Sequence, residues 1–72
     1  MRLHVVPASD ALVTSLQRQG YLTLAQGKLG LAKSELVELR SATHIAMGKV
    51  VLANAELAIL ELVSQDSPTN AQ

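Results

Sequence analysis

The sequence predicts an all-α protein, a helical hairpin that assembles with further copies of itself into an antiparallel bundle. A seven-residue apolar repeat runs from Leu22 to Leu60, and a second apolar stripe recurs at the same interval from Leu24 to Ile59. A helix with two apolar faces contacts two neighbours at once, whereas one hairpin offers each helix a single neighbour. We therefore expect a homo-oligomer, with the homodimer as its simplest form.

The composition also favours association. The chain has 72 residues, no Phe, no Trp and a single aromatic residue, Tyr21. Chains of this size lie near the lower limit for an independent core. A core without aromatic rings buries less apolar area, because each ring contributes roughly 150–250 Å². Pairing with a second copy supplies the missing burial.

The chain divides into three parts. Residues 1–7 form a short N-terminal arm, in which Leu3 and Val5 alternate with polar residues at a period of two. Residues 8–64 form the helical hairpin or bundle domain. Residues 65–72 are polar, lack apolar periodicity and are expected to form a disordered tail. The packing that defines the fold is therefore expected in the middle part.

A short first helix is predicted directly after the arm. Ser9 or Asp10 caps its start, because their side-chain oxygens can accept from the exposed amides of the first turn. Gly20 is the expected terminator, since glycine readily adopts the left-handed conformation that follows a last helical turn. The apolar face of this helix consists of Leu12, Val13 and Leu16.

A long heptad-patterned helix is predicted from about Leu31 to Ser64, after a turn near Gly27 to Gly30. Glycine weakens a helix interior by about 1 kcal/mol relative to alanine. A turn at Ser41 to Thr43 is the alternative, because cap-forming residues occur together there, but the unbroken repeat argues against it. The seam through which two copies pair is expected to comprise Leu36, Leu39, Ala46, Val50, Ala53, Leu57 and Leu60.

Charge and composition exclude several classes of function. Six basic and six acidic residues give a formal net charge of zero, which argues against a nucleic-acid partner. No stretch reaches the 18 or so apolar residues of a membrane span. The absence of cysteine rules out disulfides and thiol catalysis. These features predict a cytoplasmic protein with no nucleic-acid or membrane partner.

No enzyme, metal or cofactor chemistry is expected either. His4 and His44 are the conventional general-base candidates, and neither belongs to a recognisable triad. A metal ligand one turn from His44 on a helix would occupy position 40 or 48, where the chain has Arg40 and Gly48. The carboxylates are interpreted as solvated surface charges.

The sequence therefore favours a binding module, a dimeric adaptor or inhibitor that docks onto a larger protein and modulates it. Its size is typical of proteins encoded by phages and mobile elements. One alternative is a protein that binds or sequesters a small anionic, nucleotide-like ligand at a subunit interface. Another is a structural coiled-coil component of a larger assembly. The residues expected to contact a partner or ligand are Arg18, Tyr21, Lys28 and Lys33.

Overall fold

A computed structural model describes residues 3–64, and they form a mixed five-stranded sheet with one short helix. The prediction of an all-α helical hairpin with coiled-coil packing is therefore wrong. The predicted tail at residues 65–72 lies outside the described residues. In chain order the elements are β1 (Leu3–Pro7), α1 (Asp10–Gln19), β2 (Tyr21–Ala25), β3 (Leu36–Arg40), β4 (Ile45–Ala53) and β5 (Leu57–Ser64).

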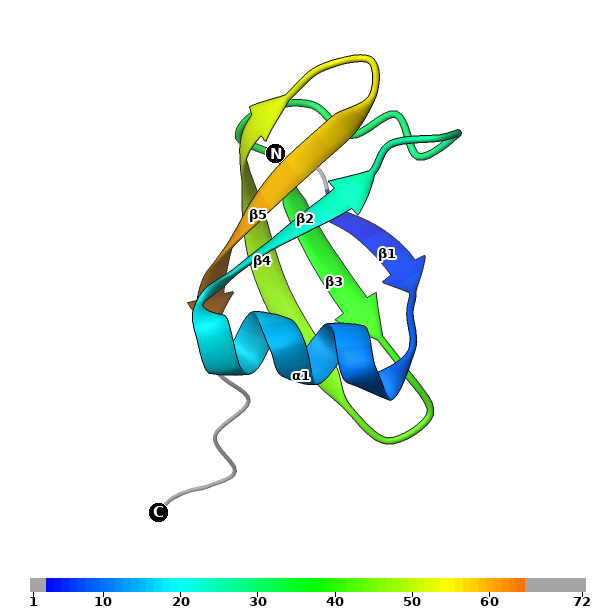
Figure 1. Cartoon of the computed structure of the whole chain (residues 1–72), viewed down its shortest axis with the longest axis vertical. Helices are drawn as coiled ribbons and strands as arrows, with labels where there is room; N and C mark the ends of the chain where they lie inside the picture. Colours follow the sequence, from blue (N-terminus) through cyan, green and yellow to red (C-terminus); the bar gives the residue numbers. More distant parts are fainter. Residues whose placement is uncertain (1–2, 65–72) are drawn as a thin grey trace.

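The strands lie in the order β1-β3-β4-β5-β2. β1 runs parallel to β3, and every other neighbouring pair is antiparallel. The sheet is strongly coiled, and α1 crosses one end of it (Figure 1). The helix joins β1 to β2, so two strands that are close in sequence become the two edges of the sheet.

The predictions for the first helix are largely confirmed. Ser9 is the N-cap and accepts a hydrogen bond from the Leu12 amide at 3.2 Å. Gly20 ends the helix in the left-handed conformation, with φ of 85°. Val13 and Leu16 are fully buried, whereas Leu12 is exposed. The helix thus forms where its caps predict, and two of its three predicted apolar contacts face the sheet.

The N-terminal arm is an edge strand of the sheet. Leu3 and Val5 point outward and are about half exposed, whereas Val6 on the opposite face is 8 % exposed. This alternation is the one predicted, and hydrogen bonding to β3 supplies the stability that five residues lack alone.

The core lies between the inner face of the sheet and α1. Gly48 of β4 lies at the centre of this core, between Leu60 of β5 and Leu16 of α1. A Cβ atom added there would lie 3.1 Å from the Cβ of Leu60 and 3.5 Å from Cδ2 of Leu16. The largest fully buried side chains are Leu16, Leu39, Leu60, Val13, Val37 and Val50.

The heptad repeat does not mark one continuous face. Successive side chains of a strand alternate between its faces, so Leu36 and Leu57 lie on the outer face, whereas Leu39 and Leu60, each three residues later, are fully buried on the inner face. A register shift between Val50 and Leu52 lets residues three apart, Val50 and Ala53, both face inward. The predicted seam residues Leu39, Ala46, Val50 and Leu60 are therefore each at most 1 % exposed, within the core of the chain itself.

Both candidate turns are loops, but they connect strands. The β3–β4 turn occupies Ser41 to His44, where the Ser41 amide donates to the His44 carbonyl at 2.9 Å. Gly27 and Gly30 lie between β2 and β3 and have positive φ values of 50° and 65°. These backbone conformations favour glycine. The positions of the two turns were therefore predicted correctly, but the elements that they connect are strands and not helices.

The loop between β2 and β3 is held by a buried glutamine. Gln26 is 6 % exposed, and its side chain donates to the Leu31 carbonyl at 2.8 Å and accepts from the Leu31 amide at 2.9 Å. The side-chain amide of Gln26 thereby satisfies both backbone polar groups of Leu31, which no neighbouring strand within residues 3–64 pairs with. Leu31, which is 4 % exposed, is fixed against the core by this pair of bonds.

We predict that Gly48→Ala destabilises the protein by about 1–3 kcal/mol, because the added methyl group would lie only 3.1 Å from the Cβ atom of Leu60 on β5 and overpack this contact. Urea unfolding measures the change in the free energy of unfolding. Lys49→Ala, at the next position on the exposed outer face, is the matched control and should stay within about 0.5 kcal/mol of wild type. Equal stability of Gly48→Ala and the control would contradict the tight packing of Gly48 against Leu60.

Candidate protein interface

The two edges of the sheet differ in how well they are protected. The Ala8 amide donates to the Arg40 carbonyl at 2.9 Å, which fixes the alternation of hydrogen bonding along β1. Even-numbered residues of β1 face β3, and the backbone groups of Leu3, Val5 and Pro7 face away from the sheet. Proline has no N–H group, so Pro7 removes a donor from this free edge. An edge proline discourages the addition of a further strand.

The free edge of β2 has no such protection. The Leu62 amide donates to the Gly20 carbonyl at 2.8 Å, and the Gln26 amide donates to the Glu56 carbonyl at 2.9 Å. Even-numbered residues of this antiparallel pair therefore face β5. The N–H and C=O groups of the remaining residues point to the free edge, and these residues are Tyr21, Thr23 and Ala25.

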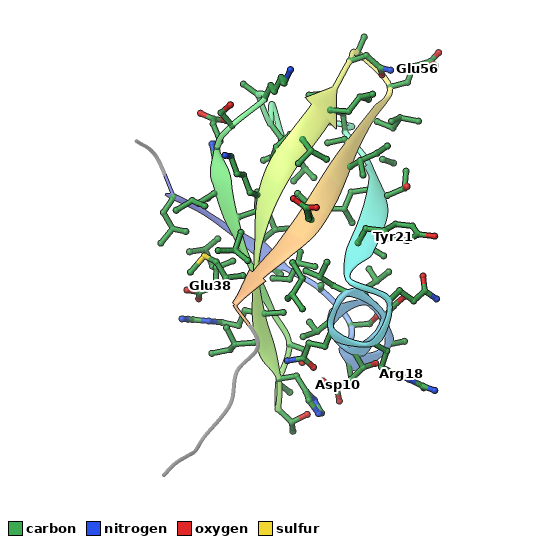
Figure 2. All side chains as sticks on the ribbon, turned by 90° about the vertical axis from the view of Figure 1, so that its left-hand side faces the viewer. Asp10, Arg18, Tyr21, Glu38 and Glu56 are labelled. Atoms are coloured by element: carbon green, nitrogen blue, oxygen red, sulfur yellow. The ribbon has the colours of Figure 1, made fainter. Side chains whose placement is uncertain are left out.

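The side chains along β2 leave this edge accessible. Its sequence, Tyr-Leu-Thr-Leu-Ala, contains no proline and no charged residue. Tyr21, Thr23 and Ala25 are all exposed, and Tyr21 has an exposed fraction of 57 %. Figure 2 shows the Tyr21 ring projecting away from the sheet, on the same side of the molecule as Arg18. An uncharged edge with unpaired backbone groups is a template for another strand.

A second, partly exposed patch lies on the outer face of β1, β3 and β4, on the side of the molecule opposite Tyr21 (Figure 2). It surrounds Glu38, whose Oε2 atom lies 2.7 Å from Nη2 of Arg40. The contact is an ion pair without hydrogen-bond geometry, because the buried Oε2 atom has no hydrogen-bond partner. β3 and β4 pair on both sides, so this patch offers side chains but few free backbone groups. Its apolar members are Leu3, Val5, Leu36 and Met47.

The four residues predicted to contact a partner or ligand are spread along β2. Arg18 is in the last turn of α1, and Tyr21 begins β2. Lys28 and Lys33 lie in the loop beyond the other end of this strand. A strand advances about 3.3 Å per residue, so the five residues of β2 separate Tyr21 from both lysines. Arg18 and Tyr21 lie on the same side of the molecule (Figure 2), and the lysines lie beyond the far end of β2.

The loop between β2 and β3 uses many of its own amides, which weakens the case for anion binding there. The Leu31 amide donates to Gln26, and the Ala32 amide donates to Oε1 of Glu35 at 2.9 Å. The Ser34 amide donates to the Val50 carbonyl at 2.7 Å. A backbone anion site needs several free, convergent amides. The small anionic ligand stays a prediction from the sequence with little geometric support.

The two histidines occupy structural positions. Nε2 of His4 lies 2.9 Å from Oε1 of Glu35, which links β1 to the start of β3. Nδ1 of His44 lies 2.7 Å from the Thr43 hydroxyl and 3.4 Å from Oδ1 of Asp10. Both partners of His44 share one ring nitrogen, whereas a proton relay uses the two nitrogens for different partners.

The residues around Asp10 tie the start of α1 to the β3–β4 turn. Hydrogen bonds from the side chains of Ser41 and Thr43, followed by the contact with His44, hold the pKa of Asp10 below its usual value of 3.8. The carboxylate also lies in the first turn of α1, where negative charge is favourable. This cluster is a helix-anchoring feature.

Residues 3–64 contain no group of three His, Asp or Glu side chains placed to hold a metal ion. The same residues include no helix long and apolar enough to cross a membrane. No protein-family model, curated protein or solved structure matches the chain significantly. The free edge of β2 is therefore assigned from its own geometry.

We predict that Asp10→Asn lowers the melting temperature at pH 7 and that the difference from wild type disappears in acid. Because folding lowers the pKa of Asp10, its contribution to stability is present above about pH 3.8 and is lost as the pH falls through the folded pKa. Thermal unfolding followed by circular dichroism across this range measures the effect. Glu56→Gln, at an exposed turn position, is the control. A difference that persists unchanged in acid would contradict the role of the charged carboxylate.

Proposed function

We propose that the chain is a protein–protein interaction module that takes up a strand of its partner at the free edge of β2. The role of a small adaptor or inhibitor that binds and modulates a larger protein, expected from the sequence, stays a prediction. Strand addition gives affinity through main-chain hydrogen bonds and specificity through the side chains of alternate residues.

The observation that carries the proposal is the contrast between the two edges. β1 ends in Pro7, which removes a donor from its free edge, whereas β2 presents three successive outward-facing residues with both donor and acceptor. Natural sheets usually protect edge strands with proline, charge or a bulge. An edge left without these features is consistent with one that is covered by another chain.

Tyr21 gives the edge a side-chain anchor. It is the only aromatic residue of the chain and one of its most exposed large side chains. Tyrosine is enriched among residues that dominate interface energetics, because it contributes both apolar area and a hydroxyl group. Arg18, on the same side of the molecule, is of a type similarly enriched at interfaces.

Two further parts of the sequence-based interpretation remain predictions. A cytoplasmic location is one, and a phage or mobile-element origin is the other. A role as a coiled-coil component is not carried forward, because the residues of the repeat lie on strands.

We predict that the photoreactive residue p-benzoylphenylalanine in place of Tyr21 crosslinks to protein in cells that produce the chain, because a bound strand would lie beside the ring. The adducts are detected on denaturing gels and identified by mass spectrometry. The same residue in place of Val5 is the matched control, because Val5 is 52 % exposed but lies beside the protected edge.

The crosslink should be lost when Thr23→Pro is added, since this change removes a donor from the free edge and none from the pairing with β5. Val5→Pro makes the same change at the other edge and should leave the crosslink in place. Equal crosslinking from positions 21 and 5, or none from position 21, would contradict the proposal.

A further inference from the structure

We infer that the strand received at the edge of β2 is β2 of a second copy of this chain, antiparallel, with a two-fold axis beside Thr23. This inference rests on the proposed function and specifies its partner. The homodimer expected from the sequence is thereby moved from a helical seam to a sheet edge.

The backbone of β2 is complementary to itself in one register. The outward-facing residues are Tyr21, Thr23 and Ala25, and they are evenly spaced about Thr23. An antiparallel copy centred on Thr23 pairs Thr23 with the partner's Thr23 and Tyr21 with the partner's Ala25. In each such pair the two residues exchange both of their hydrogen bonds. A shift by two residues would leave one of the three without a partner in each copy.

The side chains of β2 fit the same register. The large Tyr21 ring would lie opposite the small side chain of the partner's Ala25, so neither crowds the other. Thr23 would lie opposite the partner's Thr23, a pairing that is favourable across antiparallel strands. β2 carries no charged residue, and so no like charges within the two strands would oppose each other.

The protected edge explains why such pairing stops at two copies. A β1-to-β2 contact between copies would be head-to-tail, and contacts of that type continue into rings or fibres. Pro7 discourages this arrangement because the β1 edge lacks its donor there. In a two-fold pair, the open β2 edges of both copies are hydrogen-bonded to each other, and the protected β1 edges form the two ends of the joined sheet.

Self-pairing also buries additional apolar surface in a small chain whose own core is limited. The interface would cover part of Tyr21, which is 57 % exposed in the single chain. The two five-stranded sheets would join into one continuous sheet across the dimer. Isolated small cores are marginal, so the added contacts stabilise the fold as well as the pair.

The test exchanges charges at the axis. Thr23→Lys and Thr23→Glu each place two like charges opposite each other in a homodimer, and an equimolar mixture of the two variants places opposite charges there. We expect each variant alone to raise the dimer dissociation constant by at least about tenfold. The mixture should recover a heterodimer of wild-type affinity or better. Native mass spectrometry resolves the three species by mass, and sedimentation measures the dissociation constants.

Val5→Lys and Val5→Glu are the matched controls at the other edge, and neither should change the dissociation constant. Circular dichroism checks that each variant folds, which is expected because Thr23 is exposed. A wild-type chain that is monomeric, Thr23 variants that dimerise like wild type, or a mixture without heterodimers would overturn the inference. Crosslinking of position 21 to a different protein alone would overturn the second copy as partner and leave strand addition at β2 intact.

Discussion

The close packing of α1 on β4 is the contact on which the arrangement of the sheet depends. Leu16 is fully buried and packs over Gly48, where a Cβ atom would lie 3.5 Å from its Cδ2 atom. This contact holds a ten-residue helix across one end of the coiled sheet, with β1 leaving one end of the helix and β2 leaving the other. The helix therefore spans from one edge strand to the other, and β3, β4 and β5 fill the space between them.

This topology makes the two edges unequal in function. β1 enters the sheet parallel to β3 and ends at Pro7, because the chain must turn there into the N-cap of α1. β2 starts directly after the left-handed Gly20 and is free of proline and charge until the loop at Gln26. The difference in edge protection thus follows from which end of the helix each strand adjoins. An unprotected edge in a short, nearly aromatic-free chain supports association with another chain.

The local signals in the sequence were reliable, and the long-range ones were not. The caps of α1 and the period-two pattern that places Leu3 and Val5 on one face each depend on neighbours within a few residues. Each was predicted, with Ser9 as one of two candidates for the N-cap and Gly20 as the terminator. The sheet depends on pairing between distant segments such as β1 with β3, which the spacing of apolar residues does not reveal. Small inner-facing residues, Ala46 and Ala58 among them, resemble the small positions of a close-packed helical seam.

The candidate interface was partly predictable for the same reason. Tyr21 and Arg18 were selected as contact residues from their types and spacing, and they lie on the same side of the molecule. Thr23 and Ala25 were missed, because their importance lies in backbone groups that only the pairing with β5 orients. Apolar Leu22 and Leu24 alternate with exposed positions between Gly20 and Gln26, and this was the signal of a half-buried strand.

Amide hydrogen exchange across β2, followed by NMR, tests the central claim most directly. In dilute protein the amides of Leu22 and Leu24 should exchange slowly, because they donate to β5, whereas those of Tyr21 and Thr23 should exchange fast. On concentration, Tyr21 and Thr23 should gain protection as the edge becomes covered. Equal protection of all four amides in dilute protein, or fast exchange of Tyr21 and Thr23 at every concentration, would contradict an open edge that another copy covers.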